Sequence, residues 1–319
     1  MKKYTNNIKI IFAVSLLILL VFSADKVKAS CFDALLLCGR MIIPSLFPFF
    51  VLSAFMTKLG LPASLGRIIS PFFCRLYGIS PAGASALVMG FVGGYPAGAS
   101  YIADMEKEGL INTGEGERLI AFCNNSGPAF IIGVMGSSIF GSVKTGLELY
   151  AVHIVSALIA ALFFRTNEYS NTVQPHRLDE TKTAEAVVAS IKQATNSIIN
   201  VCAFVISFSV LLSLMDSGDV LSKLCGMFSS LTGQPPQFAK ALFTGILELG
   251  SAAGCMSGLE AKPLNMALAA AILSWGGLSV HFQTLAVLSE SKIKGSLHLA
   301  GRLLSATIAF ILMYFVSLF

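Results

Sequence analysis

The sequence is poor in charge. Only 12% of its 319 residues are Asp, Glu, Lys or Arg, whereas soluble domains carry about 25%. Apolar residues make up 55% of the chain, and several apolar runs are long enough to cross a bilayer. This composition excludes an ordinary soluble domain and predicts an all-α protein that crosses the membrane several times. The net charge of +5 is small and lies mostly between the apolar runs, so no nucleic-acid partner is expected.

Two further absences narrow the class. The seven cysteines are scattered and form no Cys-x-x-Cys pair, so neither a metal cluster nor a disulfide framework is predicted. The ATP-binding pattern GxxxxGK[ST] is also missing, so the energy for any transport would come from gradients or from trapping of the solute. We expect that the protein is not an enzyme and that it holds no resident metal or cofactor. Whether a proton or a sodium ion is coupled to transport is left open.

The N-terminal segment, residues 1–30, allows two interpretations. Lys2, Lys3 and Lys9 precede the apolar run 10–22, and "VKAS" (27–30) offers a cleavage point after Ala29. This pattern fits a secretory signal peptide, and it fits a first transmembrane helix equally well.

Four apolar runs predict spanning helices: 32–56, 147–164, 198–215 and 297–318. Between them lie apolar segments that glycine, proline and asparagine interrupt. The interruptions are "GFVGGYPAGASY" (90–101), "NNSGP" (124–128), "ELGSAAG" (248–254) and "SWGGLS" (274–279). A polar stretch divides the chain, which predicts a first repeat at 31–165, a polar linker at 166–190 and a second repeat at 191–319.

The two halves resemble each other. Residues 76–90, "LYGISPAGASALVMG", match residues 231–245, "LTGQPPQFAKALFTG", at seven of fifteen positions. The order of spanning and interrupted segments also recurs, which indicates an internal repeat. If the first interrupted segment of each half is a re-entrant hairpin, each half crosses three times and the halves are inverted. The distribution of Lys and Arg between the two sides agrees with this topology but does not decide it.

The interruptions predict a binding site. Irregular backbone at membrane depth is tolerated where protein buries it or where it lines a watery cavity. Broken helices leave free N–H groups and positive dipole ends near the midplane, which can hold a polar or anionic solute. We therefore predict two hairpin tips and two unwound helix centres that meet at one site; close packing of glycine-bearing helices is the alternative. The predicted solute-binding residues are Gly93, Gly94, Pro96, Asn124, Asn125, Ser126, Gly127, Gly250, Ser251, Ser274, Gly276 and Gly277.

Two charged residues lie within apolar segments. Glu248 is the carboxylate most deeply placed in an apolar run, and such a group is a functional candidate by default. It could bind a coupling proton or sodium ion, contact the solute or pair with a base. Arg40 could attract an anion, pair with Glu248, or extend to the interface. His281 and Gln283, after the last interruption, are candidates for the same cavity.

The motifs carry a family resemblance. "PSLFPFFVLS" (44–53), "GFVGGYPAGA" (90–99), "FCNNSGPAFIIG" (122–133) and the repeat resemble sporulation integral membrane proteins of the YlbJ type, within the nucleoside-recognition (gate) domain family. The resemblance implies a transporter that moves dipicolinate into the developing spore across the outer forespore membrane. It also implies a solute site at positions 93, 94, 96 and 124–127. The second half departs from this pattern, because "SWGGLS" lacks the paired asparagines.

Other functions stay open at this point. A nucleoside would fit helix N-termini and asparagine amides almost as well as dipicolinate. A sporulation scaffold would use the loops, and a membrane enzyme would need a pair such as Ser126 and His281. The expected partners are a small-molecule solute and the lipid bilayer, and a homo-oligomer is left open.

Overall fold

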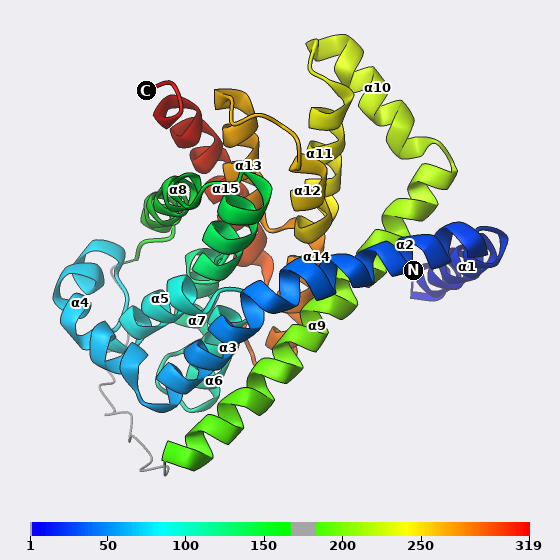
Figure 1. Ribbon diagram of the computed structural model, residues 1–319. Helices are drawn as coiled ribbons and strands as arrows, with labels where there is room; N and C mark the ends of the chain where they lie inside the picture. Colours follow the sequence, from blue (N-terminus) through cyan, green and yellow to red (C-terminus); the bar gives the residue numbers. More distant parts are fainter. Residues whose placement is uncertain (1, 167–182) are drawn as a thin grey trace.

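The computed structural model describes residues 2–166 and 183–319 (Figure 1). The described residues form helices and no strand, which confirms the predicted all-α fold. The helices of the first half are α1 (Lys2–Phe22), α2 (Ala24–Leu37), the π-helical turn η1 (Cys38–Ile42), α3 (Ile43–Lys58), α4 (Leu61–Tyr77), α5 (Pro81–Gly93), α6 (Ala97–Lys107), α7 (Thr113–Phe122), the π-helix η2 (Ala129–Ile139) and α8 (Val143–Leu162). Those of the second half are α9 (Thr183–Ser217), α10 (Val220–Thr232), α11 (Pro236–Leu247), α12 (Leu249–Met256), α13 (Pro263–Trp275), α14 (Gly277–Leu288) and α15 (Ser296–Val316).

Among the described residues, five helical segments are long and apolar enough to cross a membrane: Ala24–Lys58, Val143–Leu162, Thr183–Ser217, Pro263–Leu288 and Ser296–Val316. Each of the four predicted spans lies largely within one of them. The first span begins at Ala24, earlier than predicted, because α2 continues through η1 into α3.

The C-terminal part of the predicted linker, residues 166–190, is helical. Residues 183–190 are the first turns of α9, where Ala186, Ser190 and Ala194 are buried at helical spacing. The part of the linker at 167–182 lies outside the described residues.

The order of elements recurs in the two halves. A span is followed by a short helix, a helical hairpin, a helix broken near its middle and another span. The hairpins are α5–α6 and α11–α12, and the broken helices are α7–η2 and α13–α14. In Figure 1 hairpin α5–α6 lies in the lower part of the molecule and hairpin α11–α12 in the upper part. The fold is the predicted one, with two inverted repeats that each contain spanning helices, a hairpin and a broken helix.

The backbone conformation of a few residues determines where the helices break. Gly94 ends α5 with φ +71° and ψ −173°, a conformation that is essentially restricted to glycine. Gly276 and Gly277 separate α13 from α14 with φ values of +86° and +81°. Between α11 and α12, Glu248 is extended, with φ −147° and ψ 123°. Helices therefore stop where the sequence supplies residues that can leave helical geometry.

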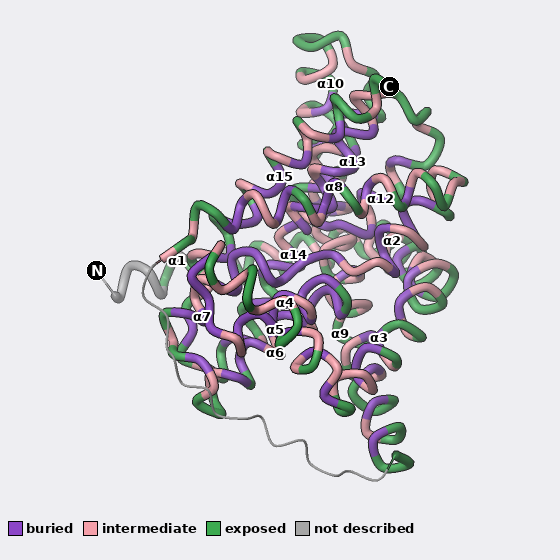
Figure 2. The backbone as a smooth tube through the Cα atoms, turned by 90° about the vertical axis from the view of Figure 1, so that its left-hand side faces the viewer, coloured by how far each residue is buried: buried purple, intermediate pink, exposed green. Residues whose placement is uncertain are grey.

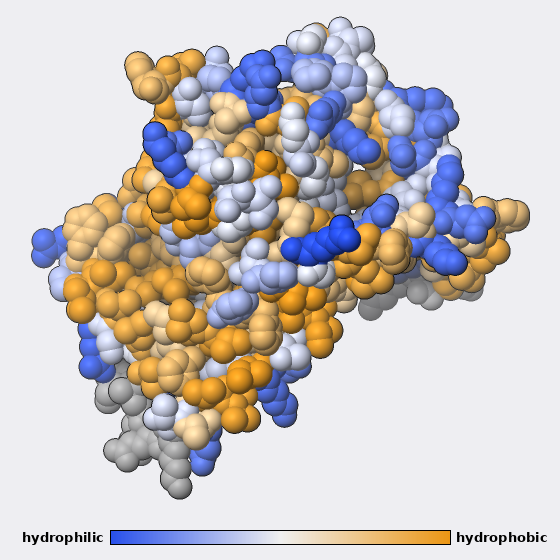
Figure 3. Space-filling view, in the orientation of Figure 1, coloured by the Kyte–Doolittle hydropathy of each residue, from blue (hydrophilic) through white to orange (hydrophobic). Residues whose placement is uncertain are grey.

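The molecule is apolar outside and polar inside at the breaks. Large apolar side chains such as Ile68, Phe72 and Phe163 are exposed, and apolar residues cover much of the face in Figure 3. Figure 2 shows the buried residues along the inner helices. The buried polar residues include Asn124 and Glu248, both at the helix breaks. Such an exterior fits lipid, which leaves the interior to satisfy the irregular backbone.

Candidate functional site

The first hairpin tip packs directly against the break of the helix that follows it. A Cβ atom on Gly94 would lie 2.9 Å from the backbone of Gly127, and one on Gly127 would lie 3.1 Å from the Cα of Gly94. Gly90 and Gly98, in the two arms of the hairpin, leave room for the Cys123 carbonyl. Glycine is thus required here by the close approach of two backbones.

The second hairpin tip meets the second break in a similar way. A Cβ atom on Gly277 would lie 3.1 Å from both the Leu247 carbonyl oxygen and the Glu248 nitrogen. The Glu248 carboxylate accepts the Gly250 N–H at 2.8 Å and also the Ser251 N–H. It therefore caps the N-terminus of α12 with its own charge.

Hydrogen bonds join the two halves at the breaks. The Ser126 hydroxyl donates to the Leu273 carbonyl oxygen at 3.0 Å. The Asn124 amide donates to Thr284 Oγ1 at 2.8 Å, and its Oδ1 accepts the Ala99 N–H at 3.2 Å. The first break is thus tied both to its own hairpin and to the second broken helix, and all four predicted interruptions converge in space.

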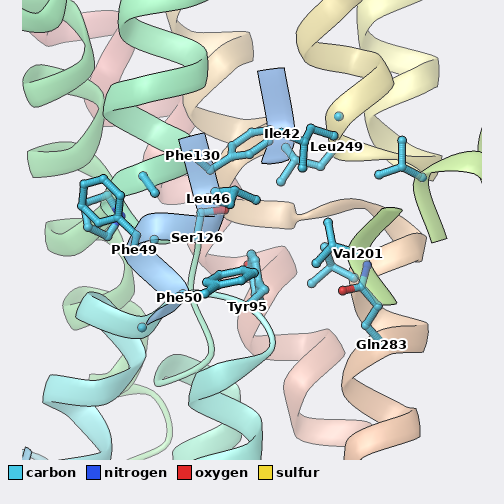
Figure 4. A pocket seen from close by; sticks show the side chains of 18 of the residues that line it. Ile42, Leu46, Phe49, Phe50, Tyr95, Ser126, Phe130, Val201, Leu249 and Gln283 are labelled. Atoms are coloured by element: carbon cyan, nitrogen blue, oxygen red, sulfur yellow. The ribbon is translucent and has the colours of Figure 1, made fainter. Parts of the chain in front are cut away.

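A cavity of about 60 Å³ lies where they converge (Figure 4). Its volume exceeds the roughly 10–15 Å³ that one water molecule needs. In the close-up, Ser126 and Tyr95 lie on one side of the cavity and Gln283 with Val201 on the other. The lining comprises residues of the tips and breaks (Gly93, Gly94, Tyr95, Ser126, Gly127, Pro128, Glu248, Leu249, Gly250), residues of α14 (Val280, Gln283), apolar residues of α5 and η2 (Val92, Ala129, Phe130) and apolar residues of η1, α3 and α9 (Ile42, Leu46, Phe49, Phe50, Val201, Val205).

Two helix N-termini, those of η2 and α12, line this cavity. The helices α6, η2, α12 and α14 each begin directly after a tip or a break. A helix N-terminus carries a partial positive charge of roughly half a unit. The N-terminus of α12 is already neutralised by Glu248, whereas η2 begins beside the cavity residues 126–128 with no acidic residue in its first turn. The first break is therefore the more electropositive part of the cavity.

The structure brings some predicted site residues to the cavity and others behind it. Of the predicted set, those that line the cavity are Gly93, Gly94, Ser126, Gly127, Gly250 and Glu248. Those outside the lining are Pro96, Asn124, Asn125, Ser251, Ser274, Gly276, Gly277 and Arg40. Most residues of the second group still shape the tips and breaks: Pro96 precedes α6, and Ser274 Oγ lies 2.8 Å from Nδ1 of His153.

Arg40 and Glu248 are not brought together. Arg40 is exposed on η1 and does not line the cavity. Glu248 is 2% exposed and is held by the backbone of α12. Within the described residues, no ion pair joins the two side chains, so an Arg40–Glu248 pair does not organise this site.

Sequence reasoning missed Arg302, which is fully buried on α15. Its guanidinium donates to Asn125 Oδ1 at 2.7 Å, to the Ala121 carbonyl oxygen at 3.1 Å and to Ser305 Oγ at 3.4 Å. Asn125 in turn donates to the Phe122 carbonyl oxygen at 2.7 Å. Arg302 thus fastens the end of α7 and the first break to α15. The available signal was an arginine inside a predicted span, four residues after a histidine.

Gln283 and His281 separate in the structure. Gln283 lines the cavity, whereas His281 does not and packs between the rings of Trp275 and His298. The Ser126 hydroxyl is engaged by Leu273, so Ser126 and His281 form no catalytic pair here.

A second, larger cavity of about 520 Å³ lies on the other side of the second hairpin tip. Ser251 and Thr244 line it, together with Lys26, Lys240 and Asp216 from the surrounding helices. Glu248 lines the central cavity and Ser251 lines the second one, so the tip of hairpin α11–α12 separates the two.

Across residues 2–166 and 183–319, no group of three or more His, Cys, Asp or Glu side chains is placed to hold a metal ion. The cavity can offer hydrogen bonds and helix dipoles to a small polar solute, and the buried charge of Arg302 lies behind the first break.

Comparisons with known proteins agree with this architecture. No protein-family model matches the chain. The sequence is 28% identical over 297 residues to the sporulation integral membrane protein YlbJ of Bacillus subtilis (strain 168), covering 85% of this chain and 72% of YlbJ. This likeness confirms the resemblance to YlbJ-type membrane proteins.

Two solved structures share the fold. CNTnw in an inward-facing substrate-bound state superposes with a TM-score of 0.58 and covers 98% of this chain and 86% of its own. A variant of CNTnw in an outward-facing state gives a TM-score of 0.62, with coverage of 100% and 86%. Both are 16% identical to this chain, so the likeness shows the fold. CNTnw is a concentrative nucleoside transporter.

Proposed function

We propose that this integral membrane protein, a relative of YlbJ, is a transporter of a small anionic solute. The observation that carries the proposal is the convergence of two hairpin tips and two helix breaks on one cavity. Broken helices at membrane depth create free backbone groups that lipid cannot satisfy, and a solute site is the use that compensates for them. The fold shared with CNTnw in inward-facing and outward-facing states supports the same function.

Charge favours an anion. The N-terminus of η2 and the buried Arg302 place positive charge at the first break. Glu248 is the one carboxylate in the cavity lining, and it is already hydrogen-bonded to the N-terminus of α12. Within the described chain, Arg302 forms no ion pair with a carboxylate, so its field reaches the break without local compensation. A solute carboxylate beside Ser126 and Gly127 would offset that charge.

We propose dipicolinate as the solute and the outer forespore membrane as the location. Dipicolinate is a planar dianion, and the apolar rings of Phe49, Phe50 and Phe130 together with Tyr95 can cover its aromatic face. The kinship with a sporulation protein supports this choice over a general metabolite. A nucleoside is the second candidate, because the fold is that of a nucleoside transporter.

The test is uptake of labelled dipicolinate into liposomes that contain the purified protein. Asn124→Leu removes the amide that joins Ala99 and Thr284, and we expect it to abolish uptake. Asn265→Leu makes the same chemical change at a half-buried position near the start of α13, outside the cavity lining, and should leave uptake intact. Uridine is measured in parallel.

The outcomes are distinct. Uptake of dipicolinate that Asn124→Leu loses and Asn265→Leu keeps supports the proposal. Uptake of uridine alone would replace dipicolinate by a nucleoside. Uptake of neither solute by folded, inserted protein would contradict transport of both and favour the scaffold function.

A further inference from the structure

Three of the four histidines of the chain gather around Arg302. His298 lies one helical turn before Arg302 on α15, and its ring centroid is 4.9 Å from that of His281 on α14. His281 also packs against Trp275 at 4.4 Å, next to Ser274, which bonds His153 of α8. We call His153, His281, His298 and Arg302 the histidine cluster. It lies behind the helix breaks and outside the lining of the central cavity.

The cluster holds a charge that no acid neutralises. The guanidinium of Arg302 is always protonated, and its acceptors are the neutral oxygens of Asn125, Ala121 and Ser305. Its Nε has no partner. In the described residues no carboxylate forms an ion pair with it. A buried charge without a counter-ion is costly, so this position is sensitive to any charge that arrives nearby.

The two neighbouring rings present free lone pairs. A backbone carbonyl only accepts, so the contact of 3.1 Å between His298 Nδ1 and the Ile120 oxygen assigns the hydrogen of the neutral ring to Nδ1. The lone pair of His298 is then on Nε2, which has no partner, and neither ring nitrogen of His281 has one. Buried nitrogens without a partner are rare and call for an explanation. Among the described residues these side chains form no metal-binding group, and a ring nitrogen with a free lone pair is the group that takes up a proton.

We propose that His281 and His298 form a proton-binding site that is coupled to the anionic solute, a role that rests on the proposed transport function. A proton from the aqueous phase binds to Nε2 of His298 or to a free nitrogen of His281 when the solute anion is in the central cavity. Without the anion, a protonated ring would face Arg302 uncompensated. Because Asn125 connects Arg302 to the break, the anion offsets the charge of both cations.

This coupling is reciprocal. If the anion raises the affinity of the ring pair for a proton, a proton raises the affinity for the anion by the same factor. A dianion that moves with one proton carries one net negative charge across the membrane.

Other titratable groups surround the pair without pairing to it. α7 carries Glu115, Glu117 and Arg118 and is followed by Cys123. His153 lies on α8, Asp104 is on α6 and Glu248 precedes α12; α13 carries none. Lys240 of α11 lines the second cavity, and Cys202 of α9 faces Cys38. The positive charge of Arg302 acts on both rings and opposes a second positive charge there, so the solute anion is needed to offset it.

The first test is the pH dependence of dipicolinate binding to the purified full-length protein. Between about pH 6 and pH 8, where carboxylic acids are ionised, we expect the wild-type Kd to tighten by up to about tenfold per unit fall in pH, the limit for one linked proton. His298→Gln and His281→Gln should flatten this slope. His153→Gln is the matched control, a buried histidine outside the ring pair, and should keep the slope. An unchanged slope in both ring variants overturns the proposal.

The second test needs no solute. NMR spectra of the protein with labelled histidine rings follow protonation directly, with assignment by single substitutions. We expect the signals of His281 and His298 to titrate together, so that replacing one ring moves the midpoint of the other. Rings that bind no proton between about pH 4 and pH 9, with or without dipicolinate, would overturn the proposal. If dipicolinate does not bind, the choice of solute fails, and the coupled titration still decides the proton site.

Discussion

Replacing Gly94 by alanine tests whether the contact between the first hairpin tip and the first break builds the cavity. The backbone of Gly94, at φ +71° and ψ −173°, lies where other residues pay about 1–3 kcal/mol. The new Cβ would also lie 2.9 Å from the Cα and nitrogen of Gly127, roughly 0.6 Å closer than the optimal separation of carbon atoms. The atoms in contact are backbone atoms of the break, which cannot rotate aside as a side chain can, so the hairpin tip must move away from the break.

Two matched variants separate these effects. Gly109→Ala places alanine at φ +72° with nothing within 4 Å, so it carries only the backbone cost of about 1–2 kcal/mol. Gly127→Ala has no positive φ, but its Cβ would lie 3.1 Å from the Cα of Gly94, so it carries only the steric effect. We expect Gly94→Ala to lose the most unfolding free energy, about 3 kcal/mol or more.

The assays are denaturant unfolding in detergent and solute uptake in liposomes. Gly94→Ala and Gly127→Ala should both impair uptake, because both displace the residues that line the cavity. Gly109→Ala should lose stability and keep uptake. If Gly94→Ala matched Gly109→Ala in both assays, the contact between tip and break would not shape the site.

Two further predictions concern the buried charges. In a double-mutant cycle of unfolding, Arg302→Met and Asn125→Leu should show a coupling free energy of about 1.5–3 kcal/mol, because each single substitution leaves the other buried side chain without its hydrogen-bond partner. Unfolding free energies that add to within about 0.5 kcal/mol would contradict this contact. Glu248→Gln should destabilise the protein by about 1–3 kcal/mol, because its amide cannot accept both the Gly250 and Ser251 N–H groups. Glu148→Gln, at an exposed pair with Lys144, should change unfolding by less than about 0.5 kcal/mol, and an equal loss in both variants would refute the capping role.

Much of the fold could be predicted because its signals are local. Long apolar runs identify the spans, and clusters of glycine, proline and asparagine identify the breaks, since these residues leave helical geometry at low cost. The ends of the spans could not be predicted in the same way. Asp25, Lys26 and Lys28 lower the apolar character before Phe32, although α2 continues through them. A helix can continue past the apolar layer of the membrane into the interfacial region, where charged side chains reach water.

The site could be predicted only in part, because its polar partners come from distant segments. The repeat-related positions of the four interruptions predict that the hairpin tips and helix breaks form one cluster. The pairing of Asn125 with Arg302 spans 177 residues and has no local signal. Arg40 and Arg302 both lie within apolar stretches, yet Arg40 faces outward and Arg302 inward. The residues around Arg302 in the sequence distinguish the two cases. His298, Gly301 and Ser305 lie on the same helix face as Arg302 and are buried, as expected for a face that points to the protein interior.

The asymmetry between the halves predicts how the proposed anionic solute would be oriented. The first break is backed by Arg302 through Asn125, whereas the second tip presents the carboxylate of Glu248. For the proposed anionic solute, we expect a carboxylate to bind at the first break, where the charge of Arg302 has no counter-ion, and not at the second tip, where Glu248 already caps α12. We therefore expect one carboxylate to be enough for recognition. Pyridine-2-carboxylate should compete with dipicolinate for binding, and the neutral pyridine-2,6-dicarboxamide should not. Arg302→Met should weaken both carboxylates and leave the diamide unchanged. Equal competition by the diamide would mean that ring shape, and not the charge at the first break, selects the solute.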